Sequence, residues 1–376
     1  MSNVDTRPIW VESGPELAEL CRRWRAQAMV ALDTEFMRSR TFFPQPALVQ
    51  VGDGERSYLI DNLAVDDLQP LRDLLQDTGV TKIMHSCSED FETLQRLLDT
   101  VPAPIFDTQI AAAIAGMEAG LGYAATVKAT LGIELPKSET RSDWLRRPLS
   151  EAQKNYAALD VAWLPAVYEV LLQRLCAKDR LQWLQEDCAA LVTAAKSPTA
   201  PESYYWKVKG AWRLRGGNLA VLQEICAWRE REARRRDLPR NHLLKESVCI
   251  AIAQGLPRHS AALAQVGIEG RALREYGDQL LQIVAQASKR ADAPPSLPQP
   301  LNRLEGEDLK QLRQMVALVA DQCGLPAEIL VRRKELEHLV QAPQPKLEGR
   351  LRGWRAEVIG ERLLQLLEKL RSEGAQ

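Results

Sequence analysis

The chain has 376 residues, more than one hydrophobic core usually spans, so two or three domains are expected. Its content of 45% hydrophobic and 26% charged residues excludes a wholly disordered or collagen-like protein. The longest stretch without a charged residue, 41–52, is too short for a transmembrane helix, and residues 1–20 lack the basic and apolar segments of a secretory signal.

The charge is distributed unevenly, although the net charge of the whole chain is −1. Residues 1–200 carry a net charge of −8, and residues 201–376 carry +7. An acidic half can hold cations, and a basic half can bind a polyanion. Seven scattered cysteines without a CxxC pair indicate reduced thiols in a cytoplasmic protein. The four histidines are far apart and give little support to a zinc site.

Strand and helix patterns alternate in the first half of the chain. The apolar run 28–32 predicts a buried strand that ends at Asp33, and 47–51 and 57–60 flank turn residues, which predicts a hairpin. Ser150 and Gln153 have capping-box spacing before a long helix to about Leu175. The other expected elements are a strand over 81–84 and helices over 68–75, from Ser86 or Ser88 to Leu98, over 108–116 after the N-cap Asp107, and over 124–131 up to Gly132. This order predicts a mixed sheet covered by helices.

The second half has almost no strand pattern. Helical spacing covers 219–236, 243–253, 260–266 and 271–287, and a second helical segment runs from about 301 to 370. A proline-rich linker over 291–300 separates the two segments. We therefore expect an α/β domain over 1–200, a helical domain over 208–290, the linker, and a second helical domain over 301–376.

Three short acidic motifs are candidates for chemistry. Asp33 and Glu35 lie two residues apart on a strand, so both carboxylates point to one face, where hard oxygen ligands suit Mg²⁺ or Mn²⁺. Asp90 lies early in a helix, and Tyr156 and Asp160 share one helical face. Taken singly, each motif also has an ordinary explanation. Asp33 and Glu35 fit a solvated pair of charges, and Asp90 fits a partner of the helix dipole. Tyr156 fits a core residue and Asp160 a surface charge.

The ordered combination of these motifs resembles the DEDD superfamily of 3′–5′ exonucleases, and within it the ribonuclease D family. The first motif stands as DTEFMR at 33–38, the second as HSCSED at 85–90, and the third as YAALDV at 156–161. The segment 137–149, KSETRSDWLRRPL, matches the stretch before the third motif. The superfamily divides on a fifth residue, and Tyr156 places this chain in the tyrosine branch, because the alternative histidine position holds Asn155.

This resemblance covers nearly the entire chain. It implies a ribonuclease H-like nuclease domain followed by two helical HRDC domains over 208–290 and 301–376. It also implies two divalent metal ions, Mg²⁺ or Mn²⁺, held by Asp33, Glu35, Asp90 and Asp160, with Tyr156 orienting the attacking water. The implied partner is RNA with a free 3′ end, such as a tRNA precursor, and the implied product is a nucleoside 5′-monophosphate. No nucleotide cofactor and no membrane are expected, and a monomer is the expected state.

Substrate contacts are predicted on both sides of this site. Phe36, Met37 and Phe42 are expected to wedge against terminal bases, and His85 to contact the scissile region. The candidates for a wall of the RNA groove are Lys137, Arg141, Trp144 and Arg146. For Phe36 and Phe42 the alternative is a place in the core, and for Trp144 it is packing under the loop. Arginines interleaved with aromatics over 201–240 suit single-stranded nucleic acid, with a salt-bridged helix face over 229–236 as the alternative.

Two other functions stay open at this point. The first is a DNA 3′–5′ exonuclease of the Werner type, because the metal chemistry does not separate RNA from DNA. The second is a nucleic-acid-binding module that has lost catalysis, although all four carboxylates of the motif are present. The chain has no GxxxxGK[ST] motif, which excludes a P-loop helicase.

Overall fold

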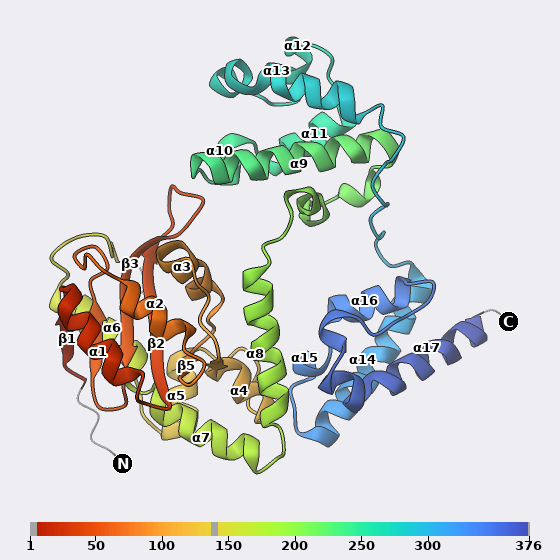
Figure 1. Cartoon of the computed structure of the whole chain (residues 1–376). Coiled ribbons are helices and arrows are strands. Elements are labelled where there is room, and N and C mark those ends of the chain that lie inside the picture. The colour runs from red at the N-terminus through yellow and green to blue at the C-terminus, as the bar shows by residue number, and fades with distance from the viewer. Residues whose placement is uncertain (1–5, 137–141, 375–376) are drawn as a thin grey trace. The chain divides into compact units, whose positions relative to one another are not determined.

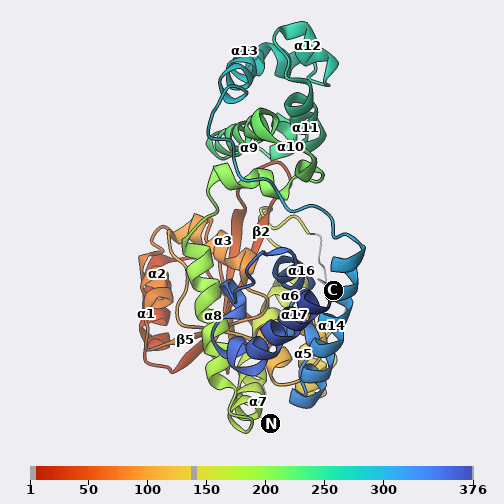
Figure 2. The same cartoon turned by 90° about the vertical axis from the view of Figure 1, so that its right-hand side faces the viewer.

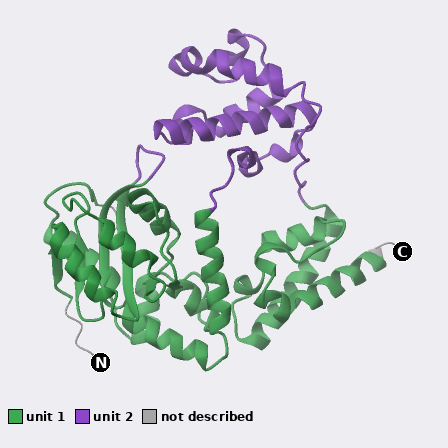
Figure 3. Cartoon of the chain, viewed as in Figure 1, with its two compact units in different colours: residues 1–37, 44–196, 301–376 green, residues 38–43, 197–300 purple. Residues whose placement is uncertain are grey.

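The computed structural model describes residues 6–136 and 142–374, and the chain divides into two compact units (Figure 3). Unit 1 combines 1–37, 44–196 and 301–376, whereas unit 2 combines 38–43 with 197–300. The division differs from the expected order of domains in two respects. The C-terminal helices group with the α/β part, and six residues from the first half belong to the central helical unit.

The centre of unit 1 is a six-stranded sheet with the strand order β1-β4-β3-β2-β5-β6 (Figure 1). β3 runs antiparallel to both β2 and β4, while the pairs β1–β4, β2–β5 and β5–β6 are parallel. The predicted mixed sheet is therefore confirmed. The strand bounds are β1 Pro8–Val11, β2 Met29–Met37, β3 Gln45–Gly52, β4 Ser57–Ile60, β5 Thr81–Met84 and β6 Ile105–Asp107.

β2 is longer than predicted. The expected end at Asp33 is wrong, because β3 continues to pair with β2 until Met37 lies opposite Gln45. A strand partner satisfies the backbone groups of the acidic motif, which the apolar pattern alone does not reveal. Asp33 and Glu35 therefore lie within a strand rather than after one. The edge strand β1 was not predicted, because it has only four residues and pairs in parallel with β4.

Helices cover both faces of the sheet. The capping box at Ser150 and the N-cap at Asp107 are confirmed, and the C-cap Gly132 adopts the left-handed conformation with a φ of 73°. The bounds are α1 Gly14–Trp24, α2 Gln69–Gln76, α3 Ser88–Leu98, α4 Thr108–Ile114, α5 Tyr123–Leu131, α6 Glu151–Ala162, α7 Leu164–Cys176 and α8 Leu181–Lys196.

Two helix predictions need correction. The long helix expected from Ser150 to Leu175 is divided at Trp163 into α6 and α7, because Pro165 has no backbone N–H to continue the hydrogen-bond ladder. The N-cap of α3 is Cys87, and neither predicted serine caps the helix. The carboxylate of Asp107 instead accepts the backbone N–H groups of Ser86 and Cys87, at 3.2 and 3.1 Å.

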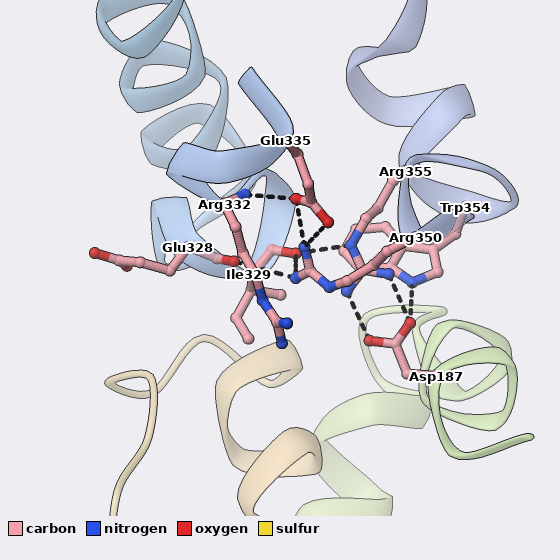
Figure 4. Close-up of polar contacts among 8 residues, drawn as sticks. All are labelled: Asp187, Glu328, Ile329, Arg332, Glu335, Arg350, Trp354 and Arg355. Atoms are coloured by element: carbon pink, nitrogen blue, oxygen red, sulfur yellow. Dashed lines mark hydrogen bonds and ion pairs between the residues drawn. The ribbon is translucent and has the colours of Figure 1, made fainter. Parts of the chain in front are cut away.

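The C-terminal helices of unit 1 form their own hydrophobic core and lie beside α8 in both views of the chain (Figures 1 and 2). The contact centres on Asp187 of α8, whose carboxylate accepts two hydrogen bonds of 2.6 Å from Arg355 and one of 3.2 Å from Trp354 Nε1 (Figure 4). Trp183 and Trp354 stack with ring centroids 4.4 Å apart. The helix bounds are α14 Arg303–Cys323, α15 Ala327–Leu330, α16 Arg333–Gln341 and α17 Glu361–Gly374, with a 3₁₀ turn at Gly349–Leu351 and a π-helical turn at Ala356–Gly360.

Unit 2 is all helical apart from its loops. Phe42, in the loop after β2, is only 6% exposed and belongs to the core of this unit. Asp237 fixes the loop by accepting the backbone N–H groups of Phe42 and Phe43, each at 2.9 Å, and the Arg240 guanidinium lies 4.6 Å from the Phe42 ring centroid. The bounds are α9 Gly216–Arg236, α10 Arg240–Leu243, α11 Glu246–Gly255, α12 Ser260–Gln265 and α13 Gly270–Ala287, preceded by 3₁₀ turns at Pro201–Lys207 and Ala211–Arg213.

None of the helices in residues 6–136 and 142–374 combines the length and the apolar character that crossing a bilayer requires.

Candidate active site

Asp33 and Glu35 lie on the face of the sheet that α6 covers. They are two residues apart on β2, so their side chains project to the same side. Ser57 lies on this face of β4, and its Oγ donates a hydrogen bond of 2.9 Å to the Ala158 carbonyl of α6. Gly52 allows the helix to approach, because a Cβ at this position would lie 2.8 Å from the Val161 carbonyl oxygen.

α6 brings Tyr156 and Asp160 to the same place. The two residues are one turn apart, and the Tyr156 hydroxyl is hydrogen-bonded to the Asp160 carboxylate. The C-terminal end of α6 is held by Tyr123 of α5, whose hydroxyl donates to the Leu159 carbonyl at 2.8 Å. The helix that carries these two residues is therefore fixed at both ends, by its capping box and by Tyr123.

Asp90 reaches the site from the first turn of α3, and it is 7% exposed. Thr34 lies between the two residues of the first motif, and its Oγ1 donates a hydrogen bond of 2.5 Å to Asp90 Oδ1. This contact ties α3 to β2 beside Asp33. Thr34 was not singled out from the sequence, and the only signal for it is a hydroxyl residue within the acidic motif.

The four carboxylates form one electrostatic group. Burial, and then repulsion by Asp90, Asp160 and Glu35, raises the pKa of Asp33 well above its ordinary value. Burial and the neighbouring carboxylates also raise the pKa of Glu35 to about 9, and burial raises that of Asp160 to about 7 and that of Asp90 to about 6. The Thr34 and Tyr156 hydroxyls act in the opposite direction on the pKa values of Asp90 and Asp160.

This donor set fits divalent cations. In the described part of the chain, no lysine or arginine forms an ion pair with any of the four carboxylates. Buried carboxylates that repel one another without a basic partner are stabilised by a hard cation such as Mg²⁺ or Mn²⁺. No three His, Cys, Asp or Glu side chains of residues 6–136 and 142–374 are close enough to form a ready metal-ligand set.

Metal affinity is expected to increase with pH. Protons compete with cations for carboxylates of raised pKa, and these groups lose their protons as the pH rises from about 6 to 9. The Mn²⁺ dissociation constant of the RNA-free protein should fall by about tenfold per pH unit for each proton that the metal displaces over this range. Titrations at pH 6, 7 and 8, followed by the electron paramagnetic resonance of free Mn²⁺, check this. A constant that does not change with pH would contradict it.

Four of the eight predicted substrate residues, His85 among them, are at least partly exposed in the described part of the chain. Phe36 and Met37 follow Glu35 on β2 and are half-buried, and Arg146 is exposed. Lys137 and Arg141 lie outside the described residues. A pocket of about 790 Å³ opens beside Tyr156 and Asp160. Its other lining residues are Gly122, Tyr123, Ala124, Ala125, Leu135, Pro136, Ala152, Asn155 and Leu159.

Three of the predicted substrate residues have interior roles. Phe42 is buried in unit 2, and Trp144 is 4% exposed beneath the loop before α6, with its ring 6.0 Å from that of Tyr156. Neither ring is the exposed surface that stacking on a base requires. His85 uses both ring nitrogens within the protein, Nδ1 with Thr108 Oγ1 at 2.8 Å and Nε2 with the Leu121 carbonyl at 3.0 Å.

The basic segment 201–240 of unit 2 shows both of the alternatives considered from the sequence, a salt-bridged helix face and an exposed surface of aromatic and basic residues. Arg234, Arg235 and Arg236 form ion pairs with glutamates of the same helix, as expected for a salt-bridged face. Trp206 is nevertheless 52% exposed, and Lys207 lies 4.7 Å from the centroid of the Tyr204 ring. The aromatic and basic surface therefore lies before α9 rather than along it.

Arg147 is a residue whose role sequence reasoning missed. Its guanidinium pairs with Asp61 at 2.6 Å and donates to the carbonyls of Ala47 and Trp144, at 2.7 and 2.8 Å. These contacts fix the loop that precedes α6 to the sheet. The only local sequence signal for this role is the pair of arginines before Pro148. Asp61, the ion-pair partner of Arg147, is 86 residues away in the sequence.

Comparison with known proteins agrees with this geometry. A family description of 3′–5′ exonucleases matches residues 8–176, and the HRDC domain matches residues 218–284. Ribonuclease D of Pseudomonas paraeruginosa is 45% identical over 96% of this chain and 97% of its own length. Ribonuclease D of Escherichia coli K12 is 36% identical over 94% and 96%.

The crystal structure of Escherichia coli RNase D, described as an exoribonuclease involved in structured RNA processing, superimposes with a TM-score of 0.86. It is 35% identical in sequence, and the match covers 96% of this chain and 98% of that one. Because the match covers 96% of this chain, it includes both helical parts as well as the α/β part. The chain therefore belongs to the ribonuclease D family of 3′–5′ exoribonucleases.

Proposed function

We propose that this exoribonuclease shortens RNA from a free 3′ end with two divalent ions, Mg²⁺ or Mn²⁺, held by Asp33, Glu35, Asp90 and Asp160. The observation that carries the proposal is the group of four carboxylates beside Tyr156, of which Asp90 is buried and the other three are half-buried, and which have no basic partner among the described residues. When bound, the ions supply an activated water and stabilise the leaving 3′ oxygen. Hydrolysis on that side of the phosphorus releases a nucleoside 5′-monophosphate.

The protein's own groups orient this reaction. The Tyr156 hydroxyl stays protonated, because burial and the charge of Asp160 raise its pKa above the ordinary value for tyrosine. It is therefore not a general base. Its single proton is donated to Asp160, so we assign the hydroxyl oxygen, as a hydrogen-bond acceptor, the orientation of the attacking water. The pocket beside Tyr156 and Asp160 supports placement of the terminal nucleotide there.

Replacing Tyr156 with Phe is expected to lower kcat by roughly tenfold to a hundredfold, because the water loses its orienting hydrogen bond. The KM for RNA should change by less than about threefold, since the ring remains. Single-turnover and steady-state kinetics on a 3′-extended transcript measure both constants. Tyr168→Phe, at a half-buried tyrosine of α7, is the matched control. An unchanged kcat in Tyr156→Phe would reject this role.

We propose structured RNAs with single-stranded 3′ ends, tRNA precursors among them, as substrates. The similarity to the Escherichia coli enzyme of structured RNA processing supports this class. The exposed Trp206 and the neighbouring Lys207 of unit 2 supply stacking and charge suited to a single strand. The seven free cysteines support a reducing compartment, the cytoplasm, and we propose a monomer as the active form.

We also propose that residues 301–376 form a second HRDC-like domain and keep the boundaries 1–200, 208–290 and 301–376. The helix lengths support the repeat. α9, α10 and α11 have 21, 4 and 10 residues, and α14, α15 and α16 have 21, 4 and 9. Each set ends with a long helix, α13 after the short α12 in the first set and α17 after the 3₁₀ and π-helical turns in the second.

A nuclease assay at single-nucleotide resolution tests the proposed function. The protein is incubated with a tRNA-like transcript that has a 3′ overhang, in Mg²⁺, in Mn²⁺ and in chelator. We expect a metal-dependent ladder that shortens from the 3′ end and stops near the duplex. The same assay with a DNA strand of matched sequence shows whether RNA or DNA is the preferred substrate. Binding of both strands without cleavage of either would indicate a nucleic-acid-binding module without catalytic activity.

A further inference from the structure

Gln50 is a buried amide without a partner at the floor of the site. It lies on β3 with no exposed surface, and neither its Oε1 nor its Nε2 has a hydrogen-bond partner within residues 6–136 and 142–374. The strand register places Gln50 directly opposite Asp33 of β2. Opposed residues of antiparallel strands project to the same face with Cβ atoms about 5 Å apart. The amide is therefore a direct neighbour of the first carboxylate of the motif.

Three of the four positions directly beside Gln50 in the sheet are apolar, while Glu35 of β2 and Ser57 of β4 lie diagonally on the same face. Leu48 and Gly52 lie two residues away on β3, and Leu59 lies opposite on β4. Asp33 is thus the only polar side chain among these four positions. Above this face, α6 closes over the sheet at Gly52 and Ser57 and keeps water away from the amide.

An amide in this position destabilises the folded protein unless it acquires a partner. Burying such a group without a hydrogen bond costs about 1–3 kcal/mol. Methionine has nearly the same length and would fill the space without that cost. In a native protein, a buried polar group without a partner is explained by a functional role, by strain, or by contact with a bound ion or water.

We propose that Gln50 is a positioning residue for Asp33. With Asp33 holding a divalent ion, Gln50 Nε2 would donate a hydrogen bond to an oxygen of the Asp33 carboxylate. Such a contact fixes the orientation of a metal ligand and satisfies the buried amide in the same step. This inference rests on the proposed function, because it assumes that Asp33 binds the metal.

The test is Gln50→Met in the full-length protein, with Gln173→Met at an exposed position of α7 as the matched control. Mn²⁺ binding is measured without RNA, from the electron paramagnetic resonance of the free ion. The dissociation constant should rise by roughly tenfold to a hundredfold, the effect typical of losing a group that orients a ligand. At saturating Mn²⁺, kcat should fall while the KM for RNA stays within about threefold of the wild-type value.

Thermal unfolding in chelator separates this role from a structural one. Because the amide lacks a partner without metal, Gln50→Met should unfold at the wild-type temperature or above it. A variant that unfolds earlier or does not fold would show that the amide supports the sheet, and would overturn the proposal. Wild-type Mn²⁺ affinity and kcat in Gln50→Met would overturn it as well. Failure of the proposed function would show instead in the wild-type protein, which would neither bind Mn²⁺ nor shorten RNA.

Discussion

Replacing Asp33 with Asn is expected to lower the rate of RNA hydrolysis by at least about a thousandfold, equivalent to about 4 kcal/mol of transition-state stabilisation. The reason is that Asp33 is the carboxylate whose pKa responds to all three other acidic residues of the group. Removing its charge removes one of the four carboxylates that are proposed to hold the metal ions. RNA affinity, measured by fluorescence anisotropy in chelator, should stay within about threefold of the wild-type value.

The same variant is expected to be more stable than the wild type in chelator at pH 8. A carboxylate whose pKa is raised in the folded state binds its proton more tightly there than in the unfolded state. Its contribution to stability is therefore lost as the pH rises from the unfolded pKa towards the folded one. The amide introduced by Asp33→Asn does not titrate, and it also relieves the repulsion on Glu35, Asp90 and Asp160.

This combination separates catalysis from folding. An inactive Asp33→Asn protein that unfolds at a higher temperature than the wild type has lost a functional group and not its structure. Asp99→Asn is the matched control, because Asp99 is an exposed residue at the end of α3 where an asparagine tolerates the left-handed backbone. Hydrolysis at the wild-type rate in Asp33→Asn would remove this residue from the metal site.

The candidate site was predictable because its signals are local. Two carboxylates at spacing i,i+2 share a strand face, and a tyrosine and a carboxylate at i,i+4 share a helix face, whatever the remainder of the fold does. The capping box of Ser150 and the N-cap of Asp107 are equally local, and both are confirmed. The order of three such motifs along the chain then led to the family.

The parts that sequence did not predict depend on distant partners. β2 extends through Asp33 because β3 pairs with it, and Phe42 belongs to unit 2 because Asp237 holds its loop from 195 residues away. The burial of the Gln50 amide beside Asp33 results from the strand register and from the approach of α6. The residues next to Gln50 in the sequence predict neither of these. Hydrophobic periodicity reports which face of an element is buried, but not which element covers it.

Replacing Asp187 with Ala is expected to destabilise the C-terminal helices of unit 1 by about 3–5 kcal/mol, the usual cost of removing one partner from a buried ion pair. The Arg355 side chain is 2% exposed, and Asp187 is the carboxylate that its two terminal nitrogens contact (Figure 4). Without Asp187, a guanidinium is left in the interior beside the stacked rings of Trp183 and Trp354.

Amide hydrogen exchange, measured segment by segment along the chain, locates the destabilisation caused by Asp187→Ala. Protection should fall in α14–α17 and in the second half of α8, and it should persist in β2, β3 and β5, which belong to another core. Asp321→Ala, at an exposed position of α14, controls for loss of an acidic residue from the same helices. Equal protection in Asp187→Ala and the wild type would mean that the pair does not hold the C-terminal helices.

A second substitution distinguishes charge burial from lost packing. If the cost in Asp187→Ala is the stranded charge, then adding Arg355→Met should recover part of the stability, because an apolar side chain of similar length needs no partner. If the cost is lost contact area, the double variant should be less stable than the single one. We expect recovery, since Arg355 Nε also donates to the Ile329 carbonyl at 2.8 Å, which accepts one hydrogen bond but does not neutralise a buried positive charge.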